Sequence, residues 1–146
     1  MPARNTRATF SGSYTKALKE IGRKLDEFSR AGIEVLAPEN ARYSHTVVDF
    51  VYLEGEKGSP LEREREHLSL IARSDLLYVV NPKGYLGKST LIEIGYAVAL
   101  GIPVYSMEKI GDSVWDSQIK SGMDAAEIKR DVWSGRRPRR QPAKAQ

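Results

Sequence analysis

The sequence predicts an α/β fold: a Rossmann-like, open and mostly parallel sheet of four to five strands with helices on both faces. Two observations carry this prediction. The N-terminal part has the pattern of a strand, a helix and a second strand joined by tight turns, which together form a βαβ unit. Further along, Leu76–Val80 (LLYVV) is an almost wholly apolar run, as expected of a strand buried on both faces of a parallel sheet.

The first unit can be divided into its elements. The first strand is expected over residues 8–11 and leads into Gly12 and Ser13. A helix is expected over residues 15–31, because apolar side chains recur there at spacings of three and four and share one face. They are Leu18, Ile21, Leu25 and Phe28. Gly32 is a typical left-handed helix end, and the second strand is expected over Ile33–Ala37.

Residues 38–58 show no clear period. A loop this long in a compact domain usually has a function or contains an element of its own. Ser59, Pro60 and Glu62 then indicate a helix start, with serine as the N-cap, proline in the first turn and glutamate three residues on. This helix would turn three apolar side chains inward: Leu68, Ile71 and Ala72.

The remaining elements are expected after Leu76–Val80. Residues 81–88 (NPKGYLGK) are rich in turn formers, and Ser89 and Thr90 are expected to open a helix. The inner face of that helix is expected to carry Ile92, Ala97 and Leu100. A fourth strand (Val104–Ser106) and two short helices, over residues 115–119 and Ala125–Trp133, would close the domain.

Composition favours one globular domain over residues 1–134. The chain has 146 residues, of which 40% are hydrophobic and 29% charged. It contains no cysteine, so disulfides, thiolate metal sites and a cysteine nucleophile are excluded, and two distant histidines do not suggest a metal site. No stretch resembles a secretory signal or a membrane span, so we expect a cytoplasmic protein without a membrane partner.

The net charge of +4 is concentrated at one end of the chain. Residues 135–146 (GRRPRRQPAKAQ) hold four arginines and one lysine, and subtracting these five charges leaves about −1 for the rest. A segment of this composition cannot bury a core, so we expect a disordered basic tail. Electrostatic contact with RNA or DNA is the alternative, but a solvated tail is favoured, and nucleic acid is not an expected partner.

Ligands of such folds bind at the carboxyl ends of the strands, where the strand order reverses. This rule selects three segments: Gly12, Ser13 and Tyr14 after the first strand, the loop after Ala37, and residues 81–93 after the third strand. In the last segment Ser89 and Thr90 lie at a helix N-terminus, where free N–H groups favour an anion. Two loop lysines, Lys83 and Lys88, could add positive charge. Neither a dinucleotide-binding G-x-G-x-x-G run nor a correctly spaced phosphate-binding G-x-x-x-x-G-K-[ST] run is present.

Glu93 has two interpretations. Thr90 and Glu93 match a capping box, in which the glutamate side chain folds back onto its own helix start. Alternatively, the carboxylate points into the crevice as the anionic nucleophile that a glycosidic carbon requires while positive charge develops on the sugar.

The sequence resembles the nucleoside 2-deoxyribosyltransferase superfamily, which includes the 2′-deoxynucleoside 5′-monophosphate N-glycosidases. The similarity spans residues 8–106 and rests on residues 10–13 (FSGS) and 74–80 (SDLLYVV). Its most specific block is residues 89–97 (STLIEIGYA), followed by residues 101–104 (GIPV). In this block Glu93 occupies the position of the family's nucleophilic glutamate.

The resemblance implies a double displacement or a hydrolysis through Glu93, with no cofactor and no metal. Gly12 and Ser13 would hold the substrate, and a second group would hold the sugar or its 5′ end: Gly87, Ser89 and Thr90. Asp75 lies where the family has an aspartate opening the third strand, with a role in chemistry or in orienting the loop.

Two departures from the family pattern stand out. An acidic position on the preceding helix falls here on His67, with Glu64 and Glu66 nearby, and this histidine either protonates the leaving base or lies on the helix surface. An arginine that the monophosphate glycosidases have after the first Gly-Ser is replaced by Tyr14-Thr15, which leaves a 5′-phosphate requirement open. Tyr14 and Tyr43 are candidates to stack on a base.

The sequence thus predicts an N-glycosidase or deoxyribosyltransferase that acts on a small nucleoside or nucleotide. The alternative is a non-catalytic nucleotide-binding sensor of the same fold. The resemblance also implies a homo-oligomer, for which residues 38–58 could supply the interface. The base, the sugar, and the choice between water and a second base as acceptor stay open.

Overall fold

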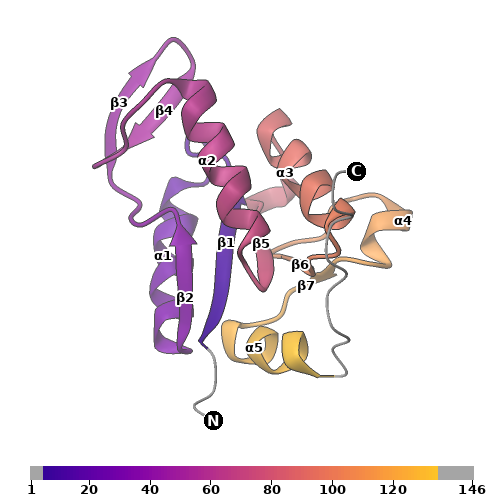
Figure 1. Ribbon diagram of the computed structural model, residues 1–146. Coiled ribbons are helices and arrows are strands. Elements are labelled where there is room, and N and C mark those ends of the chain that lie inside the picture. Colours follow the sequence, from indigo (N-terminus) through magenta and orange to yellow (C-terminus); the bar gives the residue numbers. More distant parts are fainter. Residues whose placement is uncertain (1–4, 135–146) are drawn as a thin grey trace, which may run out of the picture.

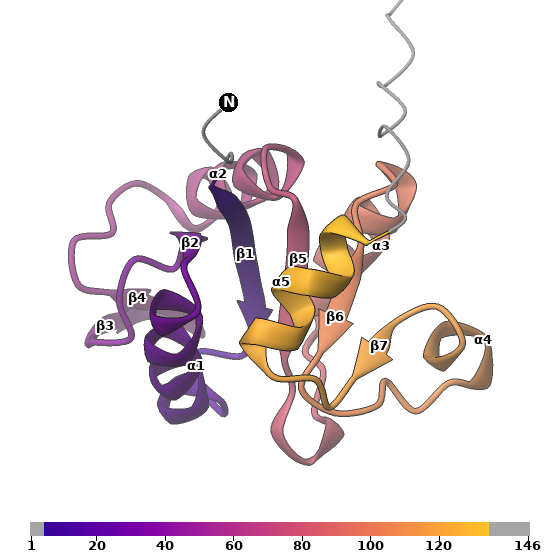
Figure 2. The ribbon, with the colours of Figure 1, turned by 90° about the horizontal axis from the view of Figure 1, so that it is seen from below.

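The computed structural model describes residues 5–134 and contains a five-stranded sheet, flanking helices and a separate two-stranded hairpin. The sheet has the order β2-β1-β5-β6-β7, and every adjacent pair of strands is parallel (Figure 2). Its strands are β1 (Thr6–Gly12), β2 (Ile33–Ala37), β5 (Leu76–Val80), β6 (Val104–Ser106) and β7 (Lys120–Ser121). This confirms the predicted α/β class with its open, parallel sheet.

The strand order reverses between β1 and β5. From β1 the chain proceeds to β2 on one side, and the later strands β5, β6 and β7 extend the sheet on the other side. Gly12, the last residue of β1, lies opposite Val80, the last residue of β5, so both strands end at the same edge of the sheet. In a doubly wound sheet the crevice at this edge is where ligands bind.

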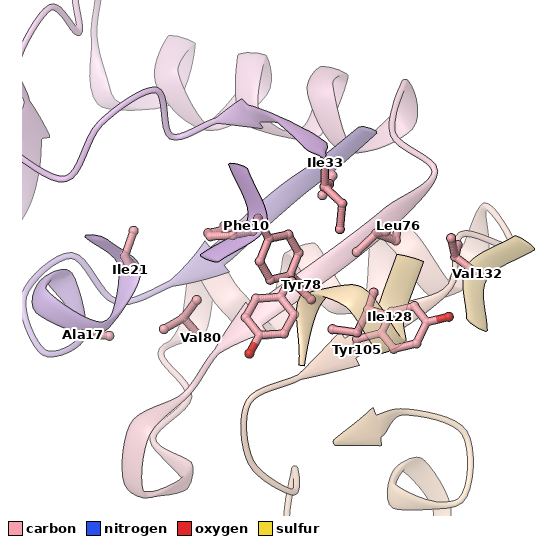
Figure 3. Packing of buried hydrophobic residues seen from close by; sticks show 13 residues of the cluster. Phe10, Ala17, Ile21, Ile33, Leu76, Tyr78, Val80, Tyr105, Ile128 and Val132 are labelled. Carbon is pink, nitrogen blue, oxygen red and sulfur yellow. The ribbon is translucent and has the colours of Figure 1, made fainter. Parts of the chain in front are cut away.

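One face of the sheet is covered by α1 (Leu18–Arg30) and α5 (Ala125–Trp133). Ile21 and Phe28, two of the residues expected on the inner face of α1, are 0% exposed. The Phe10 ring packs against the rings of Phe28 and Tyr78, with centroids 4.8 and 5.3 Å apart, and Figure 3 shows Phe10 and Tyr78 inside this cluster. Aromatic burial of this kind supplies much of the apolar area that holds α1 on the sheet.

The opposite face is covered by α2 (Pro60–Ala72) and α3 (Lys88–Ala99), which lie side by side in Figure 1. Ile71 of α2 and Ala97 of α3 are fully buried against β5 and β6. The prediction that Ile92 faces inward is wrong, because its side chain is 65% exposed. The helix begins at Lys88 rather than at Ser89.

Residues 38–58 contain an element that the sequence did not reveal. They form an antiparallel hairpin of β3 (Tyr43–Val47) and β4 (Phe50–Leu53), which lies beside the start of α2 in Figure 1. Its turn contains Val48, which is 96% exposed and has a φ of 58°. A β-branched residue seldom adopts this conformation. Hairpin turns with a positive φ usually carry Asn or Gly, and because Val48 is neither, the sequence carried no indication of a turn here.

The helix that follows the hairpin starts as predicted. Ser59 is the N-cap of α2, its hydroxyl accepts a hydrogen bond from the Glu62 N–H at 3.1 Å, and the Glu62 side chain completes the capping box. Between β5 and α3 the chain forms a short 3-10 turn, η1 (Pro82–Gly84).

Helix α5 has the predicted bounds. The other short helix, expected over residues 115–119, is α4 and spans Ser113–Asp116. The predicted basic tail, residues 135–146, lies outside the described residues. Over residues 5–134, no helix combines the length and apolarity needed to cross a membrane.

Candidate active site

A cavity of about 480 Å³ opens at the carboxyl ends of β1 and β2. Its walls come from the loop after β1, the hairpin, α2 and the start of α3, which are far apart in sequence. Lining residues include Gly12, Ser13 and Tyr14 after β1, Asp49, Phe50 and Val51 in the hairpin, Arg63, Glu64 and His67 on α2, and Gly87, Ser89, Thr90 and Glu93 around the start of α3. The cavity thus lies beside the point where the strand order reverses, as the fold rule predicts.

Gly12 allows the two central strands to end close together. A Cβ atom at this position would lie 2.8 Å from the Val80 carbonyl oxygen and 3.3 Å from the Val80 Cβ. No side chain fits at that distance without a backbone shift, so the close approach requires glycine.

Ser13 and Tyr14 form the wall nearest to β1. The Ser13 hydroxyl accepts a hydrogen bond from the Lys16 N–H at 3.1 Å and thereby shapes the turn into α1. Tyr14 lines the cavity, and burial, then the charges of Glu56, Glu93 and Glu64, raise the pKa of its hydroxyl well above the usual range. The phenol therefore stays protonated and can donate a hydrogen bond at any physiological pH.

Glu93 is not a helix cap. The N-cap of α3 is Gly87, which makes no side-chain cap, and Glu93 lies almost two turns further along the helix. Its side chain lines the cavity and the residue is only 5% exposed. Thr90, three residues earlier on the same helical face, is 4% exposed and lines the same wall. The capping-box interpretation is therefore wrong, since helix α3 starts earlier than the sequence suggested.

Burial dominates the electrostatics of Glu93. Loss of solvent raises the pKa of its carboxyl, while the Ser11 hydroxyl and the Glu64 carboxyl, which both face it, lower the pKa and oppose this rise. Ser11 is itself 1% exposed, and its Oγ has no partner in good hydrogen-bonding geometry among residues 5–134.

Glu64 faces Glu93 from α2. Burial, then the charge of Glu93 and a hydrogen bond between the two carboxyl groups, raise the pKa of Glu64 to about 7. Two carboxyl groups this close do not both ionise readily, so the pair holds a proton near neutral pH. The sequence offered one signal for this pair: Glu64 and His67 are three residues apart and share a helical face.

His67 is the third member of this cluster. Its Nε2 atom lies 3.6 Å from Oε1 of Glu93 and has no hydrogen-bond partner within the described part of the chain. Burial lowers the pKa of the imidazole, and the nearby Glu64 only partly opposes this effect. The ring is therefore neutral at neutral pH. Only 13% of the His67 side chain is exposed, so the alternative of a helix-surface histidine is wrong.

The start of α3 forms the opposite rim. Gly87, Ser89 and Thr90 line the cavity together with Lys88. The N–H groups of a first helical turn are unpaired within the helix and favour an anion. Of the two lysines that could add positive charge, Lys88 lines the cavity and Lys83 is not among the cavity residues.

Asp75 and Tyr43 are not brought to the cavity. Oδ2 of Asp75 accepts a hydrogen bond from the Arg7 N–H at 2.9 Å, at the amino ends of β1 and β5 and thus at the edge of the sheet opposite the cavity. Tyr43 is 56% exposed on β3, and its hydroxyl pairs with Thr46 at 2.9 Å. Phe50, which sequence reasoning missed, is the hairpin's aromatic residue in the cavity wall.

The side chains of Glu64, His67 and Glu93 are not arranged as ligands of one metal ion. Among residues 5–134, no three His, Asp or Glu side chains are gathered so that they could hold one ion.

Comparison with known proteins bears on the fold. No protein-family model matches the chain, and no curated protein sequence matches it. The crystal structure of a conserved protein from Enterococcus faecalis V583 is similar, with a TM-score of 0.54 and 17% sequence identity. The similarity shows the fold. It covers 74% of this chain and 66% of that one, so the chain spans just under two thirds of the length of its structural neighbour.

Proposed function

We propose that this protein cleaves or exchanges the N-glycosidic bond of a nucleoside or nucleotide, with Glu93 as the nucleophile. The observation that carries the proposal is the position of Glu93: a carboxyl group 5% exposed, without a capping role, in the wall of a cavity beside the strand-order reversal. The resemblance of residues 89–97 to the deoxyribosyltransferase superfamily adds the chemical class.

The cavity suits such a substrate in size and polarity. Its volume of about 480 Å³ falls within the range of small-molecule sites. Phe50 and Tyr14 offer aromatic surface to a base, and the Tyr14 hydroxyl offers a hydrogen bond to the sugar. At the rim, Lys88 and the first-turn N–H groups of α3 would receive the 5′ end.

The proposed reaction proceeds in two displacements. An oxygen of the Glu93 carboxylate attacks the anomeric carbon, the carbon–nitrogen bond breaks, and the base leaves with the electron pair. The resulting glycosyl ester is then opened by water in a hydrolase or by a second base in a transferase, which restores the carboxylate.

The test is a chromatographic assay of free-base release from ribo- and deoxynucleosides and their 5′-monophosphates. Wild type, Glu93→Gln and Glu66→Gln are assayed in parallel, with and without a second base. Glu66 is a matched control, because it lies on α2 but its side chain is 57% exposed. Release by wild type and Glu66→Gln, but not by Glu93→Gln, is the expected result. Nucleotide binding without release from any substrate would favour a sensor instead.

We also propose that the protein forms a homo-oligomer and acts in the cytoplasm. The exposed residues of α3 beyond Ser89 are all uncharged: Leu91, Ile92, Gly95, Val98 and Ala99. A face without charge can pack against a symmetry-related copy without burying like charges. The expected hairpin interface has support from the exposure of Tyr43, Val47 and Val48.

A further inference from the structure

We propose that the base of the substrate carries a positive charge: the cavity takes an N-glycoside of a quaternised nitrogen ring, such as a pyridinium or an N7-alkylated purine, and releases the base as a neutral molecule. This inference rests on the proposed function and names its substrate class. The observations that carry it are carboxyl groups in the cavity wall that have no cationic partner, and aromatic rings that lie in the same wall.

Carboxyl groups reach the cavity from separate parts of its wall. They are Asp49 in the hairpin, Glu56 before α2, Glu64 on α2 and Glu93 on α3. Among residues 5–134, the carboxylates that form ion pairs with lysine or arginine all belong to other residues. Unpaired carboxylates around a cavity give it a negative potential, which attracts a cation and repels an anion.

Glu93 is the most buried of these groups. Its side chain is only 7% exposed, and the one group within ion-pair distance is His67, whose imidazole is neutral because burial lowers its pKa. Burial and then the charge of Glu93 raise the pKa of Glu64 to about 7, which indicates that the cavity is short of positive charge. In the proposed reaction Glu93 attacks the carbon that carries the base. A positive charge on the base would therefore lie close to the unpaired carboxylate.

The protein's own cations at the cavity do not supply this charge. Arg63 is held on the other side, since its Nη1 donates to the Lys57 carbonyl at 3.0 Å and its Nη2 pairs with Glu66 at 2.9 Å. Lys88 lines the cavity at its rim but is exposed, so water screens its charge. The place of the missing cation is thus open to a ligand.

Aromatic rings provide the second element of recognition. Tyr14, Phe50 and Tyr85 line the cavity from three different segments. The face of an aromatic ring attracts a cation and also stacks on a flat heterocycle. Tyr85 already makes such a contact, because the Lys16 ammonium lies 5.0 Å from the centroid of its ring. Carboxylates and aromatic faces in one wall together suit a flat ring that carries a positive charge.

A positive charge on the base also simplifies the reaction. An oxygen of the Glu93 carboxylate forms a bond to the anomeric carbon while the carbon–nitrogen bond breaks. The electron pair of the broken bond moves to the ring nitrogen and cancels its charge, so the base departs neutral and needs no proton. Water then opens the glycosyl ester. Its hydroxyl stays on the sugar, its proton goes to the solvent, and the carboxylate is restored.

The first experiment compares two ligands that have the same size, differ in charge and cannot be cleaved: 1-methylnicotinamide, a cation, and its neutral 1,4-dihydro form. Calorimetry gives Kd for wild type, Glu56→Gln, Asp49→Asn and Glu54→Gln. Glu54 is the matched control, because its side chain is 53% exposed and pairs with Arg42 outside the cavity.

Wild type and Glu54→Gln should bind the cation at least about 10-fold more tightly than the neutral ligand. This preference should fall by about threefold or more in Glu56→Gln and in Asp49→Asn, since each variant removes one negative charge from the wall. Equal affinity of wild type for the two ligands would overturn the inference. An undiminished preference in both cavity variants would do the same.

A second experiment measures cleavage of a cationic N-glycoside. The substrates are N-ribosylnicotinamide and N-(2-deoxyribosyl)nicotinamide, each with and without a 5′-phosphate. Wild type and Glu54→Gln should release nicotinamide, and Glu93→Gln should be slower by at least about 1,000-fold. Release of bases from uncharged nucleosides, without release of nicotinamide, would overturn the charge inference and leave the proposed function standing. Release by Glu93→Gln at the wild-type rate would overturn the proposed function.

Discussion

The Nε2 atom of His67 lies 3.6 Å from Oε1 of Glu93, with 13% of the His67 side chain and 7% of the Glu93 side chain exposed. The two residues do not form an ion pair at neutral pH, because burial lowers the pKa of His67. The cluster therefore holds a buried negative charge without a buried positive partner. Such an arrangement destabilises the folded state and is typical of a site that serves chemistry.

Replacement of Glu93 should separate stability from activity. Glu93→Gln removes a buried ionisable group but keeps the side chain's shape, so at pH 8 the free energy of unfolding should stay unchanged or rise by about 1–2 kcal/mol. Base release should fall by at least about 1,000-fold. Urea denaturation and the base-release assay measure the two effects. A marked loss of stability would indicate a structural role for Glu93.

The stability of the protein should depend on pH through Glu64. The pKa of this carboxyl is about 7 in the folded state against 4.5 for an ordinary glutamate, so the folded state binds the proton more tightly. Stability contributed by Glu64 is present below pH 4.5 and is lost as the pH rises to about 7. Urea denaturation from pH 4.5 to 8 should show wild type losing stability relative to Glu64→Gln over this interval. Parallel curves would contradict the shift.

Two glycine substitutions should have opposite signs. Gly12→Ala places a Cβ 2.8 Å from the Val80 carbonyl oxygen and should destabilise the fold by about 1–3 kcal/mol. Gly95→Ala lies inside α3 with no atom within 4 Å of the new Cβ and should stabilise it by about 0.5–1 kcal/mol. Thermal denaturation of both variants is the measurement, and destabilisation by Gly95→Ala would show that α3 has a partner there.

Asp75→Ala should affect stability rather than catalysis. The substitution leaves the Arg7 N–H without its acceptor and should cost about 1–3 kcal/mol. Because Asp75 lies at the opposite edge of the sheet from the cavity, kcat/KM of the folded variant should stay within about threefold of wild type. A large loss of kcat/KM, measured where the variant remains folded, would restore Asp75 as a catalytic candidate.

Ile92→Glu tests the α3 face. The side chain is 65% exposed, so a charge there should leave the isolated fold intact. A self-associated wild type should dissociate on this substitution, since two copies would face each other with like charges. Sedimentation velocity of wild type and variant is the measurement, with Val48→Glu in the hairpin as the comparison. Dissociation by Val48→Glu alone would place the interface at the hairpin.

Local patterns were sufficient where one physical rule dominates. The strands Ile33–Ala37, Leu76–Val80 and Val104–Ser106 and the helix Ala125–Trp133 have the predicted bounds, because apolar runs and capping residues act within a few positions. The predicted start of α3 was one residue too late. The N-cap is Gly87, which has no side chain to form a capping hydrogen bond, so a search for a polar N-cap residue does not find it. The hairpin was missed because its turn uses Val48 in a conformation that its residue type disfavours.

The sequence by itself determined the α/β class, the central strands, the cavity residues Gly12, Ser13 and Tyr14, and Glu93 as the leading candidate. Only the tertiary structure decided between cap and cavity for Glu93, joined Glu64 and His67 to it, and separated Asp75 from the site. The physical reason is that burial and electrostatic coupling depend on which elements meet in space. His67 and Glu64 on α2 are 26 and 29 positions away from Glu93 on α3. A contact over that distance in the chain cannot be predicted from the spacing of neighbouring residues.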